Sequence, residues 1–111
     1  MNGIIITQND KGKTFTVVEG DSIKIQLSEN PTTGYRWEIK TLNANVIAFK
    51  DSNFSTDLGT GVGGGGTRTF NFNIRSSGTS KISLRLRREW ELENLMIDQF
   101  EVLIQATKKG D

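Results

Sequence analysis

The residues Asn30-Pro31-Thr32-Thr33-Gly34-Tyr35-Arg36-Trp37 hold the only proline, the only tyrosine and one of the two tryptophans of the chain. Proline fixes its own φ at about −65° and pushes the residue before it out of the α region. The two threonines are β-branched and stiff, and the glycine can adopt backbone angles that are closed to other residues. The stretch therefore predicts a rigid, exposed turn that passes directly into a strand, with Tyr35 and Trp37 as anchors in the core.

Apolar and polar residues also alternate along most of the remaining chain, as they do in half-buried strands. We expect strands or short extended segments at 4–7, 14–18, 22–28, 35–40, 46–50, 67–75, 80–88 and 97–106. No window has the apolar spacing of an amphipathic helix. About seven to eight short strands separated by turn residues are typical of an all-β, immunoglobulin-like β-sandwich of antiparallel strands. We expect residues 1–111 to form one such domain.

Composition and charge exclude several classes of function. The 14 Lys and Arg residues against 13 Asp and Glu residues give a net charge of +1, without the concentrated basic field of a nucleic-acid or membrane-surface binder. The chain has no cysteine and no histidine, so disulfides, thiol nucleophiles, histidine bases and the usual zinc sites are excluded. We therefore expect no metal and no cofactor. The start Met1-Asn2-Gly3 lacks the basic segment of a signal peptide, which favours a cytoplasmic location.

Strand order predicts that three connections lie at the same end of the sandwich. If consecutive strands run antiparallel, every second connection is at one end. These connections are the proline loop (Asn30–Gly34), the glycine loop (Gly59–Gly66) and the arginine-tryptophan loop (Arg88–Asn94). The unusual residues of the chain are thus expected to gather at one pole.

The glycine loop has three interpretations. Glycine-rich loops can bind phosphate, but that use needs a following helix, whereas here Thr67-Arg68 leads into a strand. The loop could also be a flexible linker. The third interpretation is a loop kept free of side chains so that its backbone can approach a partner closely.

The arginine-tryptophan loop is either a solvated hairpin end with paired charges or a contact surface. Trp90 lies in a charged run where a core tryptophan is unexpected, and exposed Trp and Arg are enriched at binding hot spots. Glu89, Glu91 and Glu93 are too close together on one loop to flank a sugar as the acid pair of a glycosidase does. We favour a contact role and expect no enzyme activity.

Three motifs in these loops resemble those of a known family. The proline loop and Tyr35 read Asn-Pro-Thr-Thr-Gly-Tyr, the glycine loop ends in Gly63-Gly64-Gly65-Gly66, and the third loop begins Arg88-Glu89-Trp90. In this order, they resemble the chagasin family of immunoglobulin-like inhibitors of papain-like cysteine proteases. That family has Asn-Pro-Thr-Thr-Gly-aromatic, Gly-x-Gly-Gly and Arg-Pro-Trp/Phe loops, so Glu89 departs from its pattern.

The resemblance implies a reversible, competitive inhibitor that binds as a monomer to papain-type or cathepsin L-like proteases. The proline loop would enter the catalytic cleft, with the other two loops on its walls. The implied protease-binding residues are Asn30, Pro31, Thr32, Thr33, Gly34, Gly63, Gly64, Gly65, Gly66, Arg88, Glu89 and Trp90. The added charge of Glu89 predicts weaker inhibition of proteases with acidic cleft rims. The alternative is an immunoglobulin-like recognition module for a carbohydrate or a cell-surface protein, with Trp90 stacked on sugar.

Overall fold

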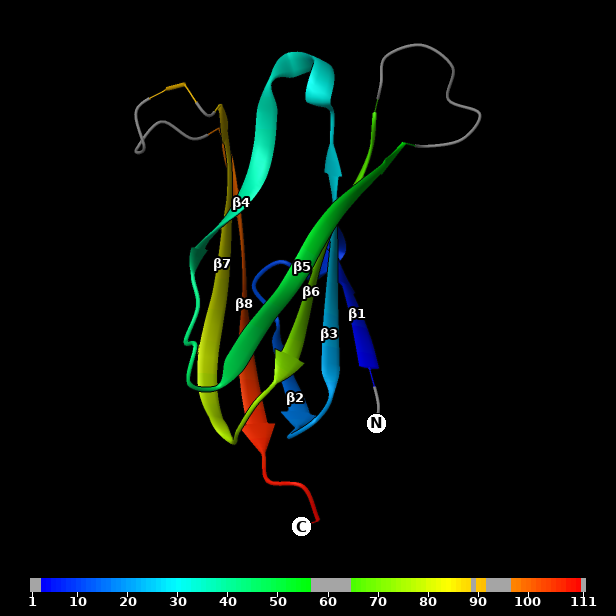
Figure 1. Cartoon of the computed structure of the whole chain (residues 1–111). Helices are drawn as coiled ribbons and strands as arrows, with labels where there is room; N and C mark the ends of the chain where they lie inside the picture. The colour runs from blue at the N-terminus through cyan, green and yellow to red at the C-terminus, as the bar shows by residue number, and fades with distance from the viewer. Residues whose placement is uncertain (1–2, 57–64, 89, 92–96, 111) are drawn as a thin grey trace.

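Two four-stranded β-sheets pack face to face in the computed structural model, which describes residues 3–56, 65–88, 90–91 and 97–110 (Figure 1). One sheet has the order β1 (Gly3–Thr7), β3 (Ser22–Glu29), β6 (Gly66–Ile74) and β5 (Ile47–Thr56). The other has the order β2 (Thr14–Val18), β8 (Asp98–Thr107), β7 (Gly78–Arg88) and β4 (Tyr35–Thr41). The helical elements of the described residues are two short 3₁₀ turns, η1 (Gln8–Asp10) and η2 (Pro31–Thr33). The predicted all-β sandwich is confirmed.

The first two strands pair differently from the others. β3 with β6, β5 with β6, β7 with β8 and β4 with β7 are antiparallel, as expected. However, β1 runs parallel to β3, and β2 runs parallel to β8. The chain crosses from one sheet to the other at η1, so each sheet receives one short edge strand. Alternation within a strand does not indicate its partner, and the sequence therefore did not predict these parallel pairs.

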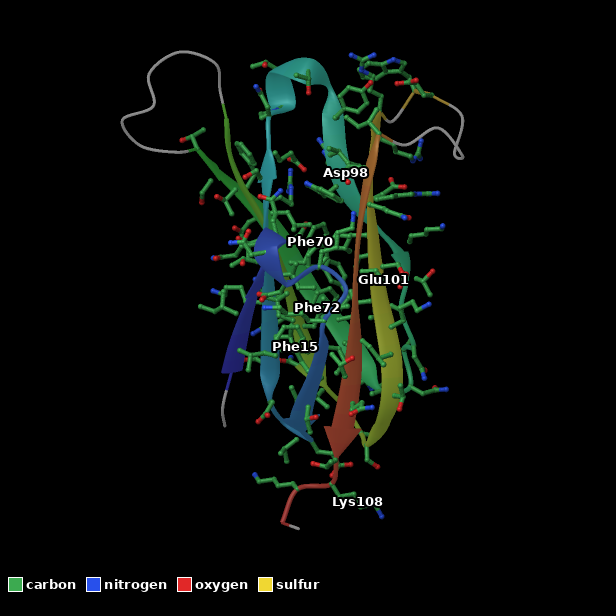
Figure 2. All side chains as sticks on the ribbon, turned by 180° about the vertical axis from the view of Figure 1, so that it is seen from behind. Phe15, Phe70, Phe72, Asp98, Glu101 and Lys108 are labelled. Carbon is green, nitrogen blue, oxygen red and sulfur yellow. The ribbon has the colours of Figure 1, made fainter. Side chains whose placement is uncertain are left out.

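The core consists of alternate residues from the inner faces of both sheets, and Figure 2 shows Phe70 and Phe72 among the side chains between them. Trp37 is 4% exposed, which confirms it as a core anchor. Tyr35 is only half-buried, at the end of β4. The prediction that Tyr35 is a core anchor is therefore wrong, since its ring lies under an arginine, as described below.

Strand β5 continues to Thr56, beyond its predicted end at residue 50. A register shift lies between Phe49 and Asp51, and pairing with β6 then resumes and continues to Thr56 opposite Gly66. Most of the side chains after the shift are exposed. Because both faces of this part of the edge strand meet solvent, its sequence shows no alternation and gave no strand signal.

Pairing register brings the ends of six strands to one pole, the sixth being β8, which begins at Asp98 opposite Leu86. Glu29 and Thr56 both lie opposite Gly66, while Tyr35 lies opposite Arg88 at the end of the second sheet. The predicted common pole of the three connections is therefore confirmed by the strand ends that they join (Figure 1). Separately, none of the helices among the described residues is long and apolar enough to cross a membrane.

Candidate functional site

The proline loop is fixed by its own hydrogen bonds. The Asn30 side-chain oxygen accepts from the Thr32 backbone N–H at 3.1 Å and from the Thr32 hydroxyl at 2.6 Å. The Thr33 hydroxyl donates to the Asn30 carbonyl at 2.7 Å, and the Gly34 N–H donates to the Pro31 carbonyl at 3.0 Å. Asn30 thereby caps the 3₁₀ turn, and Pro31 begins it with a preset φ. The predicted turn is confirmed, its internal hydrogen bonds favour the predicted rigidity, and its side chains are exposed.

Gly34 is the point where the proline loop meets the arginine-tryptophan loop. Its φ of +82° favours glycine, and a Cβ atom there would lie 2.5 Å from Cη2 of Trp90. The indole ring therefore rests on bare backbone while 72% of the residue stays exposed. The turn that carries it is held by Arg87, whose Nη1 donates to the Arg88 and Glu91 carbonyls at 3.2 and 3.1 Å.

Arg88 points toward the proline loop. Its guanidinium carbon lies 4.3 Å from the centre of the Tyr35 ring and 5.9 Å from that of Trp90. Its Nε donates to the Thr33 carbonyl at 3.1 Å. One side chain thus combines cation–π contact with a directed hydrogen bond, and it links the two loops.

A buried ion pair supports the base of the proline loop. Glu29 is 5% exposed, and its carboxylate accepts from Nη2 of Arg68 at 2.9 Å and from the Trp37 N–H at 2.8 Å. The Trp37 indole donates to the Ser28 carbonyl at 2.9 Å. These bonds join β3 and β6 of one sheet to β4 of the other, where the loop leaves the sandwich.

Sequence reasoning missed Glu29 and Arg68, although a signal was present. Glu29 follows Ile23, Ile25 and Leu27 in the inward phase of β3, and Arg68 precedes Phe70 in the inward phase of β6. Opposite charges at two inward positions on paired strands predict a buried ion pair. Because the guanidinium of Arg68 is paired with the Glu29 carboxylate, it is not available to bind a phosphate. This argues against the phosphate-binding interpretation of Thr67-Arg68.

The glycine loop and Glu89 are only partly described. Gly63, Gly64 and Glu89 lie outside the described residues. A Cβ atom at Gly66 would lie 2.2 Å from the Ser55 carbonyl oxygen, whereas Gly65 has open space around its Cβ position. Gly66 therefore allows close approach within its own sheet, and Gly65 can be approached from outside.

Glu38 links the arginines that precede the arginine-tryptophan loop. Its carboxylate pairs with Nε of Arg85 and, at 2.8 Å, with Nε of Arg87. Partial burial raises the pKa of Glu38, but the hydrogen bonds from Arg87 and Arg85 outweigh it and hold the pKa below its usual value. Arg85 and Arg87 thus strengthen the pairing of β7 with β4 through Nε, while Nη1 of Arg87 also holds the turn of the arginine-tryptophan loop.

The architecture and this pole define a class of protein: an immunoglobulin-like sandwich that presents a pre-ordered loop for binding. Residues 16–104 match the sequence model of the Chagasin family peptidase inhibitor I42. The match spans most of the chain, and the protein belongs to this family, whose members are inhibitors and not enzymes.

Individual relatives agree with this assignment. Chagasin from Trypanosoma cruzi is 29% identical over 109 residues, which cover 91% of this chain and 96% of chagasin. The crystal structure of the cysteine protease inhibitor EhICP2 from Entamoeba histolytica has a TM-score of 0.86 at 24% identity, covering 96% of each chain. PbICP-C, solved in complex with falcipain-2, has a TM-score of 0.62 at 15% identity, covering 96% of this chain and 100% of PbICP-C. The structural likenesses support the fold.

Proposed function

We propose that this protein is a reversible, competitive inhibitor of papain-like cysteine proteases, and that the proline loop enters the catalytic cleft. The observation that carries the proposal is the exposed turn from Asn30 to Gly34, held in one conformation by the chain's own hydrogen bonds. A loop that is ordered before binding loses little conformational entropy when it binds. The relatives add the target class, since EhICP2 is a cysteine protease inhibitor and PbICP-C was solved with falcipain-2.

Hydrogen bonds to the loop's carbonyls also account for the resistance to cleavage that this proposal requires. The carbonyl oxygens of Asn30, Pro31 and Thr33 each accept a hydrogen bond from within the protein. A peptide bond is cleaved when its carbonyl carbon lies in attack geometry and its oxygen receives the donors of an oxyanion hole. The internal hydrogen bonds to these carbonyl oxygens must break before the oxygens can enter an oxyanion hole. The loop therefore fills a cleft without presenting these three peptides as substrates.

The residues of the pole divide into two roles under this proposal. Pro31, Thr32 and the exposed face of Trp90 contact the protease, and Gly63, Gly64 and Gly65 allow its surface to approach closely, while Gly66 packs within its own sheet. Arg88 acts mainly by positioning the proline loop, because its guanidinium is engaged by Thr33 and Tyr35. The contribution of Glu89 and the cytoplasmic location stay predictions.

A protease panel tests the proposal. Purified protein at about 1 µM is added to papain, to falcipain-2 and, as a control, to trypsin, and the remaining activity is measured. We expect inhibition of the two cysteine proteases and none of trypsin. Trp90→Ala is expected to weaken inhibition while leaving the thermal unfolding midpoint nearly unchanged, since 72% of Trp90 is exposed. If neither cysteine protease loses activity, the proposal is wrong.

A further inference from the structure

A hollow with aromatic walls lies beside the proline loop. Its volume is about 220 Å³, and the rings of Tyr35, Phe54 and Trp90 line it, together with Pro31 and Gly34 of the loop. It lies between the pole ends of β4 and β5, each of which is the outer strand of its sheet. Figure 1 shows β5 crossing the front of the sandwich toward this pole. The hollow thus opens next to the residues proposed to contact the protease.

The charges around the hollow are mostly neutralised. Glu29 and Arg68 are paired with each other, at 2.9 Å, and both line it. Arg36 also lines it and is exposed, and its side chain forms no hydrogen bond or ion pair with the described part of the chain. Opposite Arg36 in the β4–β7 register lies Arg87, whose Nε is taken by Glu38. Among the described residues that line it, the hollow therefore has an excess of one positive charge, on Arg36.

Size and lining indicate the kind of occupant. Pockets for free small molecules usually measure about 300–1,000 Å³, so this hollow is small for such a ligand. Its aromatic walls suit an apolar side chain, and Arg36 suits a carboxylate beside it. Since Pro31 and Trp90 are shared with the proposed contact surface, the partner that reaches the loop also reaches the hollow.

We propose that the hollow is a specificity subsite that receives an apolar side chain, flanked by a carboxylate, from the rim of the protease cleft. The inference rests on the proposed function and goes beyond it, because it concerns which proteases bind best. Arg36 distinguishes them through charge, and Phe54 accepts the apolar side chain. Glu89, for which the opposite preference is predicted, lies outside the described residues and is tested separately by Glu89→Pro.

Strand β4 offers a matched pair of charge reversals. Arg36 and Lys40 are both exposed cations on β4, but only Arg36 lines the hollow. Arg36→Glu and Lys40→Glu therefore change the net charge equally. Strand β5 offers a second pair, Phe54→Ala inside the hollow and Phe49→Ala outside it. Thermal unfolding of each variant shows whether it is folded.

The inhibition constants of all four variants are measured against papain-like proteases that differ in the number of acidic residues on the cleft rim. Arg36→Glu is expected to weaken inhibition at least about tenfold for acidic rims and much less for neutral rims. Lys40→Glu is expected to change neither group. Phe54→Ala is expected to weaken inhibition where an apolar residue borders the acid, and Phe49→Ala is not.

Three results would overturn the subsite. The first is that Arg36→Glu and Lys40→Glu change the inhibition constants equally, and the second is that Arg36→Glu weakens inhibition of every protease in the panel to the same extent. Either result would show that Arg36 does not determine specificity, although the protein would still be an inhibitor. If the wild-type protein inhibits no member of the panel, the proposed function fails, and the subsite fails with it.

Discussion

At the scale of single residues, Gly34 and Trp90 explain why two loops distant in sequence behave as one site. From the sequence, Gly34 was predicted to form the exit of the turn because glycine can adopt backbone angles closed to other residues. Its φ of +82° confirms this prediction. The sequence did not predict that the Trp90 ring would rest on that glycine, because the contact depends on where β4 and β7 end in the same sheet. For the same reason, the sequence did not predict that Arg88 positions the proline loop.

Replacing Gly34 by alanine separates backbone strain from the ring contact. Gly34 and Gly12 have φ values of +82° and +84°, but no atom lies within 4 Å of a Cβ at Gly12. Gly34→Ala and Gly12→Ala are each expected to lower the free energy of unfolding by about 1–2 kcal/mol, measured in urea. The exposed indole of Trp90 can move away from a Cβ atom at Gly34, so the two variants should lose similar stability. Only Gly34→Ala displaces Trp90, and therefore only inhibition should differ between the two variants. We expect Gly34→Ala to weaken it about tenfold, and equal inhibition by the two variants would contradict this account of Trp90.

Arg88→Lys keeps the charge but removes the planar group that lies on Tyr35 and donates to Thr33. We expect faster hydrogen exchange of the Thr33 and Gly34 amides, followed by NMR, and inhibition weaker by about tenfold. The unfolding free energy should fall by less than about 1 kcal/mol.

Arg75→Lys is the matched control for Arg88→Lys, since Nη1 of Arg75 donates to the Ala44 carbonyl in a connection away from the proline loop. It should leave both the amide exchange of the loop and the inhibition unchanged. Unaltered exchange in Arg88→Lys would show that Arg88 does not position the loop.

At the scale of elements, alternation predicted where most strands lie, and the turn chemistry of Asn30 to Gly34 predicted the turn that contains η2. Two features of the strands could not be predicted from the sequence. The extension of β5 carries no alternation because most of its side chains are exposed, and the parallel partners of β1 and β2 depend on the packing of whole sheets. Glu29 and Arg68 occupy inward-facing positions in the alternation of their strands. Their pairing could be predicted from this pattern only once β3 and β6 were known to be neighbours.

The base of the proline loop is expected to depend on Glu29. Glu29→Ala leaves Arg68, whose side chain is 15% exposed, without its carboxylate, and it removes the acceptor of the Trp37 N–H. We expect a loss of about 3–5 kcal/mol of unfolding free energy in urea. The double variant Glu29→Ala with Arg68→Leu should recover part of this loss, because no unpaired charge remains. A loss below about 1 kcal/mol for Glu29→Ala alone would disprove the buried-pair interpretation.

The pairing of Glu38 predicts a dependence of stability on pH. The pKa of Glu38 is lower in the folded protein than its usual value of 4.5, so the folded state favours the ionised form. Its contribution to stability is therefore fully present above the usual value and is lost as the pH falls through the folded-state pKa. Glu38→Gln should be less stable than the wild type at neutral pH, and the difference should shrink in acid. A difference that is constant with pH in urea unfolding would contradict this.

At the scale of the whole molecule, the sandwich acts as a rigid support that brings three connections to one pole. Antiparallel order predicted this arrangement from the sequence, and the strand ends confirm it. Of the residues assigned to binding, the proline loop, Gly65, Gly66, Arg88 and Trp90 lie at the described pole. Sequence alone could not assign their separate roles, because whether a side chain contacts a partner or braces a loop depends on its neighbours in space.

The central claim is that the ordered proline loop competes with substrate for the protease cleft and survives intact. The most direct test is to titrate papain with this protein at several substrate concentrations and to follow the apparent inhibition constant. We predict that it rises linearly with substrate concentration, and that mass spectrometry finds the chain uncleaved between Asn30 and Gly34 after long incubation. An apparent constant independent of substrate, or rapid cleavage in this loop, would contradict the account.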